Sequence, residues 1–142
     1  MRATQLTLAA MVVTSLIPTA SGTSQTCAPV QLKPLHCVCG KLKDIPGDPV
    51  EHGRVTVFKA GAKIADTQTG DDGKFQIDGL REGDYELQVE AGGFKAFRFS
   101  FHLVKPEKKC KREIEVVLTI GYPQNCTGVR LVKAKAVSLP RD

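Results

Sequence analysis

Apolar and polar residues alternate along most of the chain between residues 37 and 120. The alternation is clearest over residues 97–103, where phenylalanine or leucine occupies every second position. A period of two is that of a β-strand with one buried face. It recurs in seven stretches, which we predict to be strands: 37–43, 53–59, 62–69, 74–78, 84–90, 94–104 and 113–120.

The stretches between these strands are rich in glycine, proline and aspartate, which are the residues that turns require. We therefore expect an all-β fold, a seven-stranded antiparallel β-sandwich of Ig-like character, with residues 107–112 forming a charged hairpin. The inward positions of the strands predict the core: Val38, Leu42, Val55, Val57, Phe75, Ile77, Tyr85, Leu87, Val89, Phe97, Phe99, Phe101, Leu103, Ile114, Val116, Leu118 and Ile120.

Three motifs occur in a fixed order in the middle of the chain. They are D-x-G-x-F over residues 71–75, G-L-x-x-G-x-Y over 79–85 and A-x-G-F over 91–94. This order resembles the carboxypeptidase regulatory-like domain, a transthyretin-like (prealbumin-like) β-sandwich related to collagen-adhesin B-type repeats. The likeness runs from about Cys39 to Ile120. It implies an accessory, non-enzymatic module of a secreted or cell-surface protein.

The first residues are typical of a secretory signal peptide. Arg2 precedes an uncharged run from Leu6 to Ile17, followed by Pro18 and small residues up to Gly22. We expect residues 1–22 to be removed, which predicts a secreted, periplasmic or extracellular protein; an anchor retained at the N-terminus is the alternative. No later stretch approaches the roughly 20 apolar residues of a membrane span.

The rest of the chain is long enough for one domain with a single core. We divide it into an extended N-terminal arm, residues 23–36, the sandwich, residues 37–122, and a tail, residues 123–142. Val129, Leu131 and Val132 allow one further short strand in the tail.

All five cysteines follow the signal peptide, and an exported chain of this size is expected to use them in disulfides. Five thiols form at most two bridges and leave one over. We favour bridges from the first strand to the end of the sandwich or the tail, although a redox or metal role for the C-x-C pair is the alternative. The candidates are Cys27, Cys37, Cys39, Cys110 and Cys126.

The densest basic run lies just after the phenylalanine-rich strand, and the chain has a formal net charge of +5. This run is a candidate patch for an anionic ligand such as a phosphate or an acidic polysaccharide. A solvated turn that prevents sheets from stacking is the alternative. The run contains no aromatic residue, so we expect no nucleic-acid partner. The patch residues are Lys105, Lys108, Lys109, Lys111 and Arg112.

No catalytic motif is present in the sequence, and we expect no enzyme, no cofactor and no metal. The three histidines, His36, His52 and His102, are scattered over the arm, a turn and a strand. The aspartates around Gly70 and Gly73 lack the spacing of an EF-hand loop and suit a turn. A hydrolase of the transthyretin-like fold is recognised by a C-terminal Tyr-Arg-Gly-Ser, which this sequence does not contain.

The sequence therefore predicts a secreted, non-enzymatic binding or structural accessory module whose partner is a protein or a glycan at the cell surface. The alternative is a carbohydrate-binding accessory protein of the cell envelope.

Overall fold

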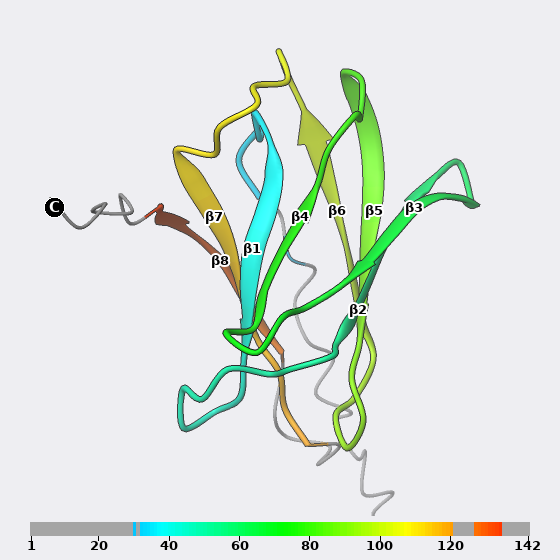
Figure 1. Cartoon of the computed structure of the whole chain (residues 1–142). Helices are drawn as coiled ribbons and strands as arrows, with labels where there is room; N and C mark the ends of the chain where they lie inside the picture. Colours follow the sequence, from blue (N-terminus) through cyan, green and yellow to red (C-terminus); the bar gives the residue numbers. More distant parts are fainter. Residues whose placement is uncertain (1–29, 31, 121–126, 135–142) are drawn as a thin grey trace, which may run out of the picture.

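The computed structural model describes residues 30, 32–120 and 127–134, which form an all-β sandwich of two four-stranded sheets (Figure 1). The sheet orders are β4-β1-β7-β8 and β3-β2-β5-β6. Within the described residues no helix is long and apolar enough to cross a membrane. The strands are β1 (Val38–Lys43), β2 (Arg54–Lys59), β3 (Ala62–Gln68), β4 (Lys74–Ile77), β5 (Gly83–Glu90), β6 (Phe97–Leu103), β7 (Arg112–Val117) and β8 (Gly128–Lys133).

The expected β-sandwich is confirmed, but the prediction of seven strands in a wholly antiparallel arrangement is wrong. The eighth strand, β8, is the further strand that the tail allowed, and it pairs antiparallel with β7. In addition, β1 pairs parallel with β7, with Gly40 opposite Ile114 and Leu42 opposite Val116. Periodicity reports which face of a strand is buried but not which strand lies beside it, so the sequence pattern contains no signal for this parallel pair.

The core lies between the two sheets, where the inward side chains of both meet. Leu42, Val55, Val57 and Leu87 have no exposed surface, and Ile114 is only 1% exposed. The alternation predicts these positions correctly because each strand has one face against the opposite sheet. Ile120 is an exception at 56% exposure. It follows the end of β7 at Val117, so the alternation no longer determines the direction of its side chain.

The hairpin expected over residues 107–112 is not formed, and the β6–β7 connection spans residues 104–111. β6 belongs to one sheet and β7 to the other, so this segment crosses from sheet to sheet. In Figure 1 it runs over the top of the molecule, from the end of β6 to the start of β7, close to the start of β1. The β6–β7 connection therefore places its charged residues at the end of the sandwich where β1 begins.

The described part of the arm lies along the end of β6. The Leu35 amide donates to the His102 carbonyl oxygen at 2.8 Å, and the Val104 amide donates to the Leu35 carbonyl oxygen at 2.8 Å. Leu35 is 4% exposed and belongs to the core. These contacts fix the direction in which the chain enters β1. The predicted signal peptide, residues 1–22, lies outside the described residues.

Candidate functional site

Three of the five candidate cysteines meet at the start of β1. The Cys110 sulfur lies within bonding distance of the sulfurs of both Cys37 and Cys39. The Cα atoms are 5.5 Å apart for Cys37 and Cys110 and 6.6 Å apart for Cys39 and Cys110. Because a sulfur atom forms only one disulfide bond at a time, these are two alternative bridges. Cys27 and Cys126 lie outside the described residues.

The parallel pairing of β1 with β7 brings this cysteine cluster (Cys37, Cys39 and Cys110) together. Since the two strands run in the same direction, the residues that precede β7 lie beside those that precede β1. The carbonyl oxygen of Arg112, the first residue of β7, lies 3.9 Å from the sulfurs of both Cys37 and Cys39. Cys39 is 8% exposed, whereas Cys37 and Cys110 are half-buried.

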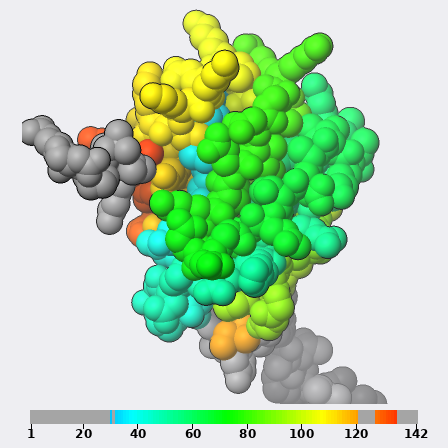
Figure 2. Space-filling model, viewed as in Figure 1, coloured from blue at the N-terminus to red at the C-terminus, as the bar shows by residue number. Residues whose placement is uncertain are grey.

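A groove of about 780 Å³ opens beside the cluster, between β4 and the β6–β7 connection. Cys39 and Cys110 line it together with three lysines, Lys74, Lys108 and Lys109. Glu113 is its one acidic lining residue. Figure 2 shows the corresponding face, with the β6–β7 region (yellow) beside β4 (green) and β1 (cyan) visible between them. We call this surface the lysine groove.

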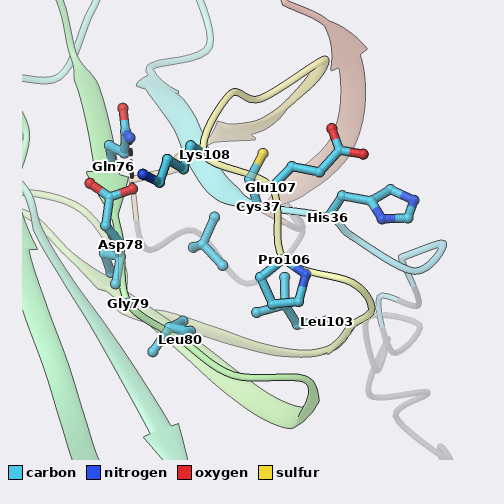
Figure 3. Close-up of a pocket in the computed structure, with 12 residues that line it drawn as sticks. His36, Cys37, Gln76, Asp78, Gly79, Leu80, Leu103, Pro106, Glu107 and Lys108 are labelled. Carbon is cyan, nitrogen blue, oxygen red and sulfur yellow. Dashed lines mark hydrogen bonds between the residues drawn. The ribbon is translucent and has the colours of Figure 1, made fainter.

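A second groove, of about 490 Å³, lies on the other side of Cys37 (Figure 3). Its apolar wall contains Leu80, Leu103 and Pro106. In Figure 3 the Lys108 side chain is directed towards the Gln76 and Asp78 side of the opening.

The predicted basic patch is divided by the fold. Lys108 and Lys109 line the lysine groove. Lys111 and Arg112 line a smaller hollow of about 320 Å³ beside Cys37, where Lys111 forms an ion pair with Glu107 at 3.2 Å. Lys105 is set apart, and its backbone amide donates to a carboxylate oxygen of Glu82 at 3.3 Å. The five cations therefore do not form a single patch.

The lysine groove contains residues that the sequence interpretation did not include. Lys74 and Gln76 come from β4, and Gln68 from the end of β3. Lys74 and Gln76 alternate with the buried Phe75 and Ile77, so the pattern predicts that they face outwards. The alternation of polar and apolar residues does not predict that β4 pairs with β1 and so forms one wall of the groove.

The histidines are separated, as expected from their positions in the sequence. His36 Nδ1 lies 2.8 Å from the Val104 carbonyl oxygen, and His102 Nδ1 lies 2.6 Å from an Asp84 carboxylate oxygen at the surface. His52 has a positive φ of 54° and shares an exposed group with Glu51 and Asp71, whose ligand atoms lie within 4.8 Å of one another. Exposed acidic groups of this kind are common on protein surfaces.

Asp72 has the role in a turn that the sequence suggested. Its carboxylate accepts a hydrogen bond from the Lys74 amide at 3.1 Å. This backbone hydrogen bond is the main cause that lowers the pKa of Asp72. The carboxylate thus orders the entry into β4.

Glu115 is the buried carboxylate of the outer face of its sheet. It is 6% exposed and accepts hydrogen bonds from Lys43 Nζ at 2.8 Å and Arg130 Nε at 2.7 Å. The Lys43 hydrogen bond is the main cause that lowers the pKa of Glu115; burial opposes this effect and Arg130 adds to it. The three side chains connect β1, β7 and β8, so this cluster joins the predicted tail strand to the sandwich.

The described residues form a two-sheet β-sandwich with a cysteine cluster at one end, which defines the class of protein. The model of the carboxypeptidase regulatory-like domain matches residues 38–119, more than half of the chain. The protein belongs to this family, and the resemblance seen in the sequence motifs is confirmed.

Solved structures that match the chain include a 5-hydroxyisourate hydrolase from Klebsiella pneumoniae, at 16% sequence identity and a TM-score of 0.49. The match covers 71% of this chain and 100% of that one. No curated protein matches the chain.

Proposed function

We propose that this protein is an exported, non-enzymatic binding module and that the lysine groove is its ligand site. The observation that carries the proposal is the convergence of Lys74 on β4 with Lys108 and Lys109 on the β6–β7 connection. Two elements that are distant in sequence thus contribute lysine side chains to one hollow, and the Lys74 amino group is 3.4 Å from the exposed carboxylate of Asp72. A concave surface with cations on both walls attracts an anionic ligand more strongly than a convex turn does.

The remaining titratable groups support a binding role over catalysis. The carboxylates of Asp72 and Glu115 have a lowered pKa, and in each case the cause is a hydrogen bond that holds strands or a turn in place. Catalytic acids and bases are instead tuned towards the working pH and are aimed into a cleft. In this proposal the ligand is bound and released unchanged.

The cysteine cluster supports this role because in an exported chain, where disulfides form, it can cross-link the region that forms the groove. A bridge from Cys110 to Cys37, which directly precedes β1, or to Cys39, which lies on it, fixes the β6–β7 connection against that strand. We call Cys37 and Cys39 the β1 cysteines. Fixing a loop before binding lowers the ordering cost that a ligand otherwise has to offset. An accessory module at the cell surface, with an acidic protein segment or acidic polysaccharide as its partner, combines these properties.

Calorimetric titration of the oxidised protein with two probes, a heparin fragment and a polyglutamate peptide, tests the proposal. We expect at least one probe to bind, and the double variant Lys108→Glu with Lys109→Glu to weaken that binding by about tenfold or more. Binding of the heparin fragment alone would favour the carbohydrate-binding alternative.

The matched control changes the net charge equally but away from the groove, by Lys63→Glu with Lys95→Glu. Lys63 is on β3, at the edge of the other sheet. Lys95 lies just before the start of β6, whereas the β6–β7 connection follows the end of that strand. We expect this control to bind almost as the unchanged protein does. Equal loss in both double variants would show attraction to net charge alone and would refute the groove as the site.

A further inference from the structure

We propose that Cys37, Cys39 and Cys110 form a thiol–disulfide exchange site. In this site Cys110 is bridged to one of the β1 cysteines, and the other β1 cysteine remains a reactive thiol. This inference goes beyond ligand binding and does not depend on the lysine groove having a ligand.

The cluster contains one sulfur more than a single disulfide uses. One disulfide uses two sulfurs, but three lie within 4.8 Å of one another. Once Cys110 is bridged, the remaining β1 sulfur is thus adjacent to the bridge. Thiol–disulfide exchange requires this proximity, because a thiolate attacks a disulfide sulfur directly.

Neither bridge requires the backbone to move. Disulfides span Cα separations of about 4.4–6.8 Å. The separations here, 5.5 Å from Cys37 to Cys110 and 6.6 Å from Cys39 to Cys110, both fall in this interval. The same backbone therefore accommodates both disulfides.

Charged side chains surround the cluster. Lys74, Lys108 and Lys109 face it from the lysine groove, and Lys111 and Arg112 from the smaller hollow. The acidic groups on these sides are Glu113, Glu107 and Asp78, and two of the lysines are paired, Lys111 with Glu107 and Lys74 with Asp72 at 3.4 Å. His36 lines both hollows on the Cys37 side. The balance is cationic, and nearby cations favour the thiolate, which is the nucleophilic form of cysteine.

The exchange step is balanced without an added oxidant. Starting from the Cys37–Cys110 bridge, the Cys39 thiol gives its proton to water, and the resulting thiolate attacks the Cys110 sulfur and forms the Cys39–Cys110 bond. The Cys37–Cys110 bond breaks, its electron pair leaves on Cys37, and this thiolate takes a proton from water. The number of disulfides and thiols is unchanged.

The two states differ in which thiol is accessible. Cys39 is 8% exposed, so the Cys37–Cys110 bridge leaves the sheltered sulfur as the thiol. The Cys39–Cys110 bridge instead leaves the thiol on Cys37, which is half-buried and lines two of the hollows. Exchange thus transfers the reactive thiol from the nearly buried Cys39, which lines the lysine groove, to the more exposed Cys37, where it can form a mixed disulfide with a small disulfide such as oxidised glutathione.

Linkage mapping of the full oxidised chain tests the proposal. The chain is quenched in acid, thiols are blocked with N-ethylmaleimide, and peptides are sequenced without reduction, with fragment ions on either side of Val38 assigning each bond. We expect both bridges to be present, each with the blocking group on the other β1 cysteine. With oxidised glutathione as the probe, we expect the mixed disulfide to form on Cys37.

Cys37→Ser and Cys39→Ser separate exchange from a static disulfide. We expect each variant to form its remaining bridge to Cys110 and to lose the cluster thiol that the unchanged chain presents to N-ethylmaleimide. A single bridge in the unchanged chain that stays unaltered after incubation at pH 8 would overturn the proposal. So would a cluster with no thiol because a β1 cysteine is bonded to Cys27 or Cys126. Since the mapping uses protein oxidised after purification, its result is independent of whether the chain is exported.

Discussion

Gly40 on β1 packs directly against the backbone of Ile114 on β7. A Cβ atom at position 40 would lie 2.1 Å from the Ile114 carbonyl oxygen and 2.8 Å from the Phe75 ring. The parallel pair that assembles the cysteine cluster therefore depends on the absence of a side chain at this position. The Phe75 ring can adopt another rotamer, but the Ile114 carbonyl oxygen is fixed by the strand backbone and cannot move to make room for a Cβ atom.

We expect Gly40→Ala to lower the free energy of unfolding by about 3 kcal/mol, the upper part of the range for overpacking in a core. The measurement is urea unfolding of the oxidised protein followed by circular dichroism, with the midpoint lowered and the slope unchanged. Gly92→Ala is the control, because a Cβ there meets no atom within 4 Å. Equal stability of the two variants would mean that β1 and β7 are not paired as described.

The sequence predicts the strands and their buried faces more completely than it predicts their neighbours. Phe99 and Phe101 are each 4% exposed, and Val116 has no exposed surface, all as the alternation indicates. Burial on one face is a local property of a strand, so a period of two reports it. Whether β7 follows β6 in a hairpin or crosses to β1 depends on long-range contacts, which alternation does not encode.

The Glu115 carboxylate binds both Lys43 and Arg130. Glu115→Gln keeps the shape of this side chain and removes its charge. We expect it to lower the free energy of unfolding by about 1–2 kcal/mol at pH 7. Hydrogen bonds to a charged group have this magnitude, discounted here because the Arg130 side chain is 70% exposed. Urea unfolding at pH 7 measures the difference.

The same carboxylate predicts a dependence on pH. Because its partners lower the pKa of Glu115 below the ordinary value of 4.5, the folded state binds its proton less readily than the unfolded state does. The stabilisation is therefore complete above the ordinary value and is lost as the pH falls through the lowered pKa. We expect the difference between the unchanged protein and Glu115→Gln to shrink below pH 4.5.

Asp66→Asn is the control for both measurements. Asp66 pairs with Lys63 at 3.1 Å, but their side chains are 43% and 53% exposed. Exposed pairs of this kind contribute about 0.5 kcal/mol or less. If Asp66→Asn were as destabilising as Glu115→Gln, burial would not be the cause of the Glu115 effect.

Tyr85→Phe removes one hydroxyl from the edge of the core. The Tyr85 hydroxyl donates to the Arg81 carbonyl oxygen at 2.6 Å, while its ring stacks on Phe101 with centroids 5.6 Å apart. The substitution keeps the ring and leaves the carbonyl without this donor. We expect a loss of about 1 kcal/mol in the free energy of unfolding. Tyr85→Leu, which also removes the stacked ring, should cost clearly more, and equal costs would show that the hydroxyl contributes all of the effect.

The cysteine cluster and the lysine groove are adjacent in the fold, although the spacing of these residues in the sequence does not predict it. The sequence identifies the cysteines and the basic run separately, because each is a local pattern. Their meeting depends on the crossing of the β6–β7 connection over the start of β1, which also separates Lys105 from Lys108 and Lys109. Lys74 enters the groove through the pairing of β4 with β1, a contact between strands that are about thirty residues apart in the chain.

The alternative bridges predict an asymmetry among three cysteine variants. A bridge that closes a loop with a sequence separation of 71 or 73 stabilises the fold by about 4 kcal/mol in the chain-entropy model. Cys110→Ser removes both bridges and should lose this amount. Cys37→Ser and Cys39→Ser each leave one bridge of almost the same loop length, so each should lose about 1 kcal/mol or less. Urea unfolding without reductant, on protein whose linkage has been mapped, measures the three differences.

Repeating the three measurements in a phosphine reductant isolates the contribution of the bridge. With every disulfide opened, we expect the variants to agree with the unchanged protein within about 0.5 kcal/mol, because Cys→Ser is then a small change at half-buried or nearly buried positions. If only one of Cys37→Ser and Cys39→Ser lost about 4 kcal/mol of the free energy of unfolding without reductant, that cysteine alone would form the bridge to Cys110. We expect only Cys110→Ser to lose the full stabilisation, because either Cys37 or Cys39 can hold the β6–β7 connection when the other is replaced. The Cα separations permit both bonds.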